Sequence, residues 1–193
     1  MRRRGRQNDQ GSASVLVLPA AMAAVALTVL LVVGLGGASQ TRRGATTAAD
    51  AAALAAAQEW RDRIGGQYAL DTSTDGTVPS FAGRELGDLL GGARSRAREL
   101  AVANDAVLES FDVDPARAEV TVTTRTSQQF AGTTRDFRAS AVARIELRSG
   151  ACRDGATLGL MVSGCVSSAA EAAALELTMR DVSSFEAVVT LVR

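Results

Sequence analysis

The sequence predicts an α+β protein with a long N-terminal transmembrane helix, an alanine-rich extension of that helix, and a small antiparallel sheet packed on one or two helices. An uncharged apolar stretch, an alanine-rich stretch and later segments of period-two alternation carry this prediction. They divide the chain into a basic tail (1–12), a transmembrane helix (13–38), an alanine-rich juxtamembrane helix (39–64) and an extracytoplasmic α+β body (65–193).

The composition excludes several classes of enzyme. All 21 cationic side chains are arginine, and the chain has no histidine and no lysine. A Ser-His-Asp triad, an imidazole metal site, a Schiff base and a P-loop lysine are therefore excluded. A mechanism that uses carboxylates alone stays open in principle, but no pair of acids stands out. We predict no catalytic residue, no cofactor, no metal site and no small-molecule substrate.

The charges are unevenly distributed along the chain. Residues 1–40 hold four arginines and Asp9, whereas residues 41–193 hold 17 arginines and 20 acids. An acidic main body argues against binding to nucleic acid. The division indicates a membrane topology instead.

The apolar segment has the length of a membrane crossing. Residues 13–38 are uncharged and exceed the ~20 residues that a bilayer-spanning helix needs. The apolar segment has more arginines before it than after it. Those before it are Arg2, Arg3, Arg4 and Arg6, and those after it are Arg42 and Arg43. The positive-inside rule therefore predicts a cytoplasmic N-terminus, an extracytoplasmic body and contact with membrane lipid.

A cleaved signal peptide is the alternative interpretation of this segment. Gly36 and Ala38 are small residues of the kind that precede a cleavage site. The apolar run is longer than the ~7–15 residues of a signal-peptide core, which favours a retained anchor.

Small residues recur at helical spacing along this part of the chain. Alanine is the best helix former, so residues 45–64 are predicted to continue the helix after the membrane. A face of small side chains lets another helix or a sheet approach closely. The residues predicted to form such packing faces are Ala20, Ala24, Gly34, Ala38, Ala49, Ala53, Ala56 and Trp60.

Two stretches of the N-terminal region resemble a known family. The stretch 'GSASVLVLP' enters the apolar span, and 'AADAAALAAA' (48–57) follows it. Together they resemble the N-terminal region of TadE/TadG-like proteins, which are pilin-related components of Tad (Flp) pilus assembly. The alanine-rich, lysine-free composition is typical of an actinobacterial-type member. A TadE-type prepilin has a glutamate five residues after its cleavage glycine. If Gly11 is that glycine, Leu16 stands at the position of the glutamate, which argues against processing there. The chain is therefore more similar to TadG-like members or to a divergent actinobacterial branch.

The body is predicted to contain helices and strands in alternation. Residues 65–83 have loop composition, and residues 84–111 have helical periodicity. Alternating residues predict strands over 118–125 and 137–147, joined by a flexible connector, and a third strand over 185–191. The sheet has one apolar face, which the helix at 93–111 or the alanine helix can cover. Between the last two strands, Ser168 and Glu171 fit a capping box that opens a helix with Leu175 and Met179 facing inward.

Cys152 and Cys165 are the two cysteines of the chain. An extracytoplasmic location would allow a disulfide between them, and two separate buried thiols are the alternative. A metal site is improbable without histidine or further thiols.

The resemblance implies a single-pass structural or assembly component of a Tad-type pilus or related secretion system, with a pilin-like body. Its expected partners are other pilus assembly or pilin subunits, contacted through helix packing. The alternative is an anchored or secreted extracytoplasmic binding module without a pilus role, which would use the arginine-bearing face of the sheet.

Overall fold

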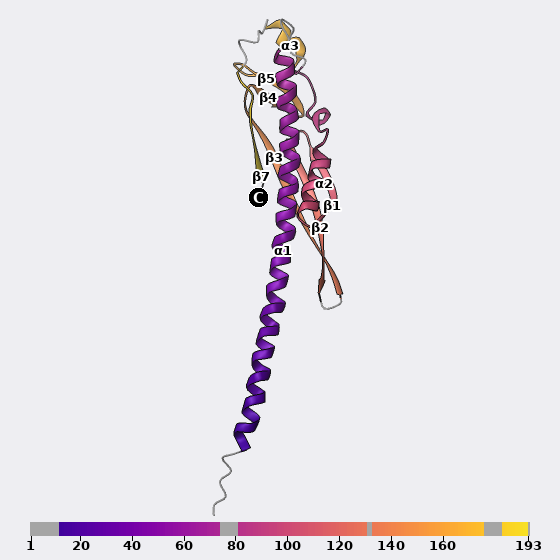
Figure 1. The fold of residues 1–193 in the computed structure, drawn as a ribbon. Coiled ribbons are helices and arrows are strands. Elements are labelled where there is room, and N and C mark those ends of the chain that lie inside the picture. The colour runs from indigo at the N-terminus through magenta and orange to yellow at the C-terminus, as the bar shows by residue number, and fades with distance from the viewer. Residues whose placement is uncertain (1–11, 74–80, 131–132, 176–182, 193) are drawn as a thin grey trace, which may run out of the picture. The chain divides into compact units, whose positions relative to one another are not determined.

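The structure is a computed structural model that describes residues 12–73, 81–130, 133–175 and 183–192. The chain divides into two compact units, Met1–Thr41 and Arg42–Arg193, which we describe separately. Figure 1 shows the elements, which are α1 (Ser12–Ser73), the 3-10 helix η2 (Leu86–Leu89), α2 (Ala93–Ala103), β1 (Val107–Asp114), β2 (Glu119–Phe130), β3 (Thr133–Ser149), β4 (Ala151–Asp154), β5 (Thr157–Met161), β6 (Cys165–Val166), α3 (Ala169–Ala174) and β7 (Glu186–Val192).

The N-terminal unit is helical from Ser12. Its described side chains, at residue 22 and over 24–28, are all exposed, and Met22 is 70% exposed. In the described part of the chain, no helix combines the length and the hydropathy that a bilayer crossing requires. The transmembrane helix over 13–38 therefore stays a prediction.

Helix α1 continues past the predicted boundary at residue 64. Residues 65–73 are helical, so the loop predicted from residue 65 was wrong over this part. Each glycine in a helix interior costs about 1 kcal/mol relative to alanine. Tertiary contacts offset that cost here: a Cβ on Gly65 would lie 3.0 Å from the Phe185 ring, and the Tyr68 hydroxyl donates to the carbonyl oxygen of Ser183 at 2.6 Å.

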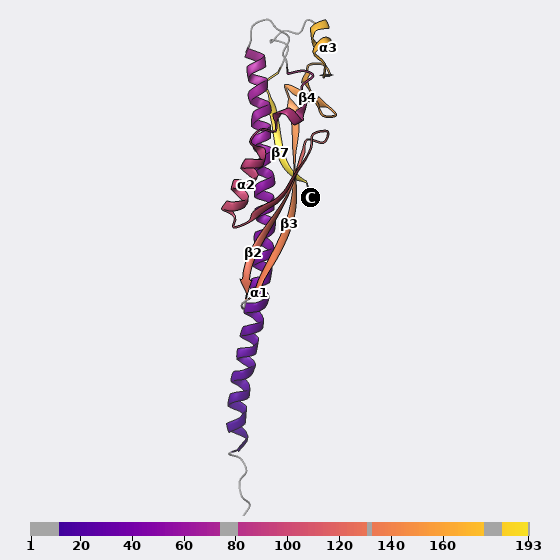
Figure 2. The same ribbon diagram turned by 90° about the vertical axis from the view of Figure 1, so that its right-hand side faces the viewer.

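The larger sheet has the strand order β1-β2-β3-β7, with every neighbouring pair antiparallel. This confirms the α+β class with a small antiparallel sheet. The pairing places Val120 opposite Ala143 and Val122 opposite Ala141 on the buried face. In Figure 2, α2 and the part of α1 that belongs to the body lie on this one side of the strands.

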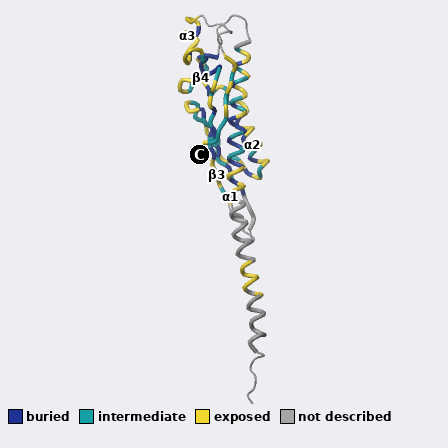
Figure 3. Tube along the Cα trace, turned by 90° about the vertical axis from the view of Figure 1, so that its left-hand side faces the viewer, coloured by how far each residue is buried: buried dark blue, intermediate teal, exposed yellow. Residues whose placement is uncertain are grey.

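The core lies where α1 meets the sheet (Figure 3). One broad face of α1 is fully buried, and its members are Ala48, Ala49, Ala52, Ala53, Ala56, Ala57, Trp60 and Ile64. Alanine side chains keep the helix backbone close to the strands, where Thr124 donates its hydroxyl to the carbonyl oxygen of Ala45 at 3.4 Å. Trp60 satisfies its buried indole N–H by donating to the carbonyl oxygen of Leu86 at 3.0 Å. The alanine-rich segment is thus part of the body's core.

The helix predicted over 84–111 is shorter than its periodicity indicated. Residues Ala93–Ala103 are helical, but Asp105 has a φ of 54° and Val107–Asp114 forms the edge strand β1. The end of the run fits both periods, because Phe111 and Val113 also alternate with Asp112 and Asp114. Pairing with β2 decides between them, since Phe111 lies opposite Val122 on the apolar face.

The remaining predictions have mixed outcomes. The two alternating segments form β2 and β3, which extend to Phe130 and Thr133 instead of leaving a flexible connector, and the third strand is β7. Ser168 caps α3 as predicted, because its hydroxyl accepts from the Glu171 N–H at 3.1 Å. The inward orientation of Leu175 was wrong, since Leu175 is 54% exposed, and Met179 lies outside the described residues. The second sheet, β4-β5-β6, was not predicted.

The alanine face of α1 should not tolerate a larger side chain. We expect Ala53→Leu to lower the free energy of unfolding by about 1–3 kcal/mol, because Ala53 is completely buried and the sheet would have to move away. Chemical denaturation of the purified chain measures this change. Ala69→Leu makes the same substitution at an exposed position of α1 and should leave stability nearly unchanged. Equal effects at the two positions would contradict close packing at Ala53.

Candidate functional site

The face of the larger sheet opposite α1 is polar and is built by alternation. Apart from Val142, the residues of β2 and β3 that alternate with the buried ones carry charge or hydroxyl groups, and they meet across the strands. Thr123 and Ser140 face each other in the β2–β3 register, and their hydroxyl oxygens lie 2.8 Å apart. This face is the arginine-bearing surface that the sequence predicted, and we call it the polar sheet face.

Ion pairs connect the strands of the polar sheet face. Glu109 on β1 lies 3.0 Å from the Arg125 guanidinium on β2 and 2.6 Å from the Arg138 guanidinium on β3. Further along the same strands, Arg144 forms an ion pair with Glu119. The arginines are thereby neutralised by neighbouring carboxylates, so this part of the face is not a free cationic patch.

The Glu109 pair also sets the protonation of its members. The hydrogen bond from Arg138 holds the pKa of the Glu109 carboxyl below its ordinary value, and the charges of Arg138 and Arg125 act in the same direction. In return, Glu109 raises the pKa of Arg138. Both groups therefore remain charged at neutral pH.

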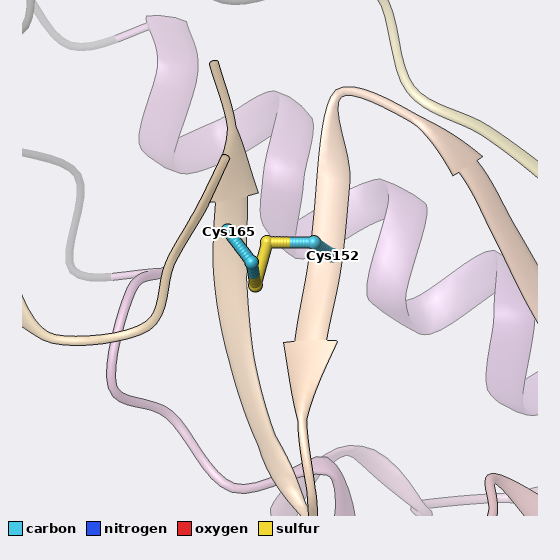
Figure 4. The surroundings of a disulfide bond; sticks show 2 residues. All are labelled: Cys152 and Cys165. Atoms are coloured by element: carbon cyan, nitrogen blue, oxygen red, sulfur yellow. A yellow bond between two sulfur atoms is a disulfide. The ribbon is translucent and has the colours of Figure 1, made fainter. Parts of the chain in front are cut away.

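The predicted disulfide is present between Cys152 on β4 and Cys165 on β6 (Figure 4), with their Cα atoms 5.6 Å apart. Both strands pair with β5, which lies between them. The bond crosses β5 at Gly159, where a Cβ would lie 3.0 Å from the Cys152 sulfur and 2.6 Å from the Val166 carbonyl oxygen. Glycine is therefore required at this crossing.

A cleft of about 520 Å³ lies beside the disulfide. Strand β3 forms one wall, and the small sheet forms the other. Its lining combines two arginines with apolar and sulfur-bearing side chains, and consists of Arg144, Ile145, Glu146, Leu147, Cys152, Arg153, Met161 and Cys165. Arg144 and Arg153 are already engaged, by Glu119 and by the Ala116 carbonyl oxygen respectively.

A second groove, of about 430 Å³, runs between α1 and β7. Its walls are Arg61, Asp62 and Gly65 from the helix, Glu186 and Ala187 from the strand, and Phe185 just before the strand. The Arg61 guanidinium donates to the Asp62 carboxylate at 2.6 Å. The sequence analysis did not identify this groove, because it depends on α1 continuing past residue 64. Its strand was predicted over 185–191, but the extension of the helix beside it was not.

The residues predicted for helix packing fall in two different environments. Ala49, Ala53, Ala56 and Trp60 are completely buried in the body, so their contacts are made within this chain. In the N-terminal unit, Ala24 is exposed, and the side chains of Ala20, Gly34 and Ala38 lie outside the described residues. The structure therefore divides the predicted packing residues between an internal core and a separate helical unit.

Comparison with known proteins identifies a family. Residues 11–59 match the model of the family described as "Putative Flp pilus-assembly TadE/G-like". This confirms the resemblance seen in the sequence of the N-terminal region. Neither the curated proteins nor the solved structures gave a match.

The Glu109 ion pairs should make part of the stability pH-dependent. Because folding lowers the pKa of Glu109, its contribution is fully present above the unfolded value of about 4.3 and is lost as the pH falls through the lower folded value. We expect the wild type to have a higher melting temperature than Glu109→Gln at pH 6, with the difference shrinking toward pH 3. Thermal scans across this range test the expectation. Glu186→Gln replaces an exposed acid on β7 and is the control. A melting-temperature difference between the wild type and Glu109→Gln that does not change with pH would contradict the expectation.

The disulfide should stabilise the body substantially. Its closed segment is short, with a sequence separation of 13, and a loop of about 15 residues corresponds to about 3 kcal/mol. We expect replacement of both Cys152 and Cys165 by alanine to lower the unfolding free energy by that amount. Reductant should weaken the wild type similarly and leave the double variant unchanged. Loss of stability in the double variant on adding reductant would contradict this assignment.

Proposed function

We propose, from the family match over residues 11–59, that this chain is a single-pass membrane-anchored component of a Tad-type pilus or a related secretion system. It would act as a minor pilin or a TadE/TadG-like assembly factor. The family points to a role in pilus assembly and to a structural rather than an enzymatic task. The likeness covers the N-terminal region, and the body is what the chain would display outside the membrane.

The position of the match in the fold carries this proposal. The matched segment ends at residue 59, within the alanine face of α1 that is buried against the sheet. The family's segment is therefore not an appendage to an unrelated domain, because its C-terminal part supplies core residues of the body. A shared structural role for the segment and the body follows from this packing.

The sequence supports an anchor over residues 13–38. The segment is uncharged, and the arginines at 2, 3, 4 and 6 outnumber those at 42 and 43. Its described apolar side chains, including Val25 and Leu27, are exposed in the chain alone, and lipid would cover them. The proposed topology has a cytoplasmic tail (1–12), a crossing (13–38) and an extracytoplasmic body.

The disulfide supports the extracytoplasmic location of the body. Disulfides persist in oxidising compartments and are rare in the cytosol. The Cys165 side chain is exposed, so a reducing compartment would have access to the bond. An envelope or surface location is thus consistent with both the family and the bond.

The anchor can be tested by adding charge to the crossing. We expect the double substitution Val25→Arg and Leu27→Arg to remove the protein from the membrane fraction, because each arginine at the centre of a crossing costs about 2.5–3.5 kcal/mol. Gln58→Arg, at an exposed site of α1 in the body, is the matched control and should stay in membranes. Fractionation with intact-mass analysis gives the readout.

The same preparation distinguishes the alternative function. Wild-type protein recovered from the culture fluid with its N-terminus near Ser39, and absent from membranes, would overturn the anchor. A secreted binding module would then be favoured. In the native organism, deletion of the gene should reduce piliation, and normal pili in the deletion strain would exclude the assembly role.

A further inference from the structure

The two residues of the disulfide differ in their access to solvent. Cys152 is buried, at 4% exposure, whereas Cys165 is exposed and follows an exposed stretch at residues 162–164. The Cys152 sulfur also lies against β5, 3.0 Å from the position that a Cβ on Gly159 would take (Figure 4). A molecule that approaches the bond from solvent therefore reaches Cys165 first.

The cleft of about 520 Å³ beside the disulfide has the size of a small-molecule site. Pockets that bind small molecules typically measure about 300–1,000 Å³. Both cysteines contribute to the lining of the cleft, and Leu147 and Met161 add apolar side chains to it. In the β5–β6 register Met161 lies directly opposite Cys165. A small molecule that enters the cleft is thus brought to the bond.

One cation of the cleft lining is not neutralised by an acid. Arg144 forms an ion pair with Glu119. Arg153 donates instead to two backbone carbonyl oxygens, that of Ala116 and that of Gly155, the latter at 3.2 Å. In the described part of the chain, no carboxylate forms an ion pair with this guanidinium. Because carbonyl groups carry no net charge, the positive charge of Arg153 remains uncompensated at the wall of the cleft.

This charge favours reaction of the disulfide with negatively charged thiols. The acid of the lining, Glu146, lies 3.0 Å from the Arg148 guanidinium and is neutralised by it. Arg153 therefore sets the sign of the charge that an entering molecule meets. The thiolate is the form of a thiol that attacks a disulfide, and its rate depends on access to the sulfur that it attacks. The exposed Cys165 provides that access.

We propose that Cys165 is a thiol-exchange site, at which a small thiol that carries negative charge enters the cleft and opens the disulfide. Its thiolate forms a new S–S bond with the Cys165 sulfur, and the bond between Cys165 and Cys152 breaks. The electron pair of that bond leaves with Cys152 as a thiolate, which takes a proton from water. The attacking sulfur is oxidised and the Cys152 sulfur is reduced, so the step needs no further oxidant or reductant.

The fold holds the opened site in a position from which the bond can form again. Val166 is 5% exposed and pairs with Leu160, so β6 stays attached to β5 without the covalent bond. The released Cys152 thiolate therefore remains near Cys165 and can attack the mixed disulfide, which expels the small thiol. The bond would thus open and close with the thiol content of its compartment. The inference rests on the disulfide and requires neither the pilus role nor the membrane anchor.

Peptide mapping of the mixed disulfide tests which sulfur is attacked. The full chain in detergent is mixed with 2-mercaptoethanesulfonate, quenched with acid at early times, digested with pepsin and analysed by mass spectrometry. We expect at least about tenfold more adduct on Cys165 than on Cys152, because access decides which sulfur reacts. Equal adducts on the two residues, or more on Cys152, would overturn the assignment. A bond that a reduced dithiol protein opens but this small thiol does not would equally overturn it.

A charge variant tests the role of the cleft. The rate of opening by 2-mercaptoethanesulfonate is divided by the rate with cysteamine, a thiol of similar size and positive charge. At low salt we expect Arg153→Gln to lower this ratio at least about threefold, and added salt should reduce the difference. Arg153→Lys keeps the charge and should keep the ratio, and Arg96→Gln on α2 is the control away from the cleft. An unchanged ratio in Arg153→Gln, or an equal loss in Arg153→Lys, with circular dichroism showing that both are folded, would contradict this role.

Discussion

The close approach of the alanine face of α1 to the sheet is the constraint on which the body depends. Burial of an alanine side chain contributes little, since the gain scales with the apolar area removed from water. What the small side chains provide is proximity, which brings the helix backbone into dispersion contact with the strands. Aromatic residues make up only 4% of the chain, and the largest fully buried side chains include Trp60 and Ile64 on this face and Phe81, which packs against Tyr68.

This one-sided packing explains the rest of the architecture. With α1 and α2 on one face of the larger sheet, the other face is polar and is joined by cross-strand ion pairs. Exposed pairs of this kind contribute little to stability because water screens them, so they keep the face solvated and in register more than they stabilise it. A covalent bond is correspondingly important in the small sheet, where β6 consists of Cys165–Val166 and pairing alone is short.

The sequence predicted those features that a local pattern specifies. The strands around Val122 and Ile145 and the last strand follow from period-two alternation, and the capping role of Ser168 follows from its spacing to Glu171. The disulfide followed from the two cysteines and the predicted location of the body. The errors arose where two periods fit one segment or where a distant contact decides. Residues from Val107 onward suit a helix or a strand until β2 is present, and Gly65 stays helical because Phe185 packs on it. The groove beside β7 depends on the alternation of that strand and also on the distant contact that keeps Gly65 helical. It was therefore not predicted.

The internal use of the alanine face limits how this chain can contact others. Small residues at helical spacing usually suggest helix-to-helix assembly, but Ala49, Ala53 and Ala56 are completely buried under the strands of their own body. A partner helix could reach them only by displacing the sheet, which would expose the core. Any contact with another protein must therefore use surfaces that folding leaves open. In the described body these include the polar sheet face, where acids already neutralise arginines, and the β7 edge, where backbone groups and apolar side chains remain accessible.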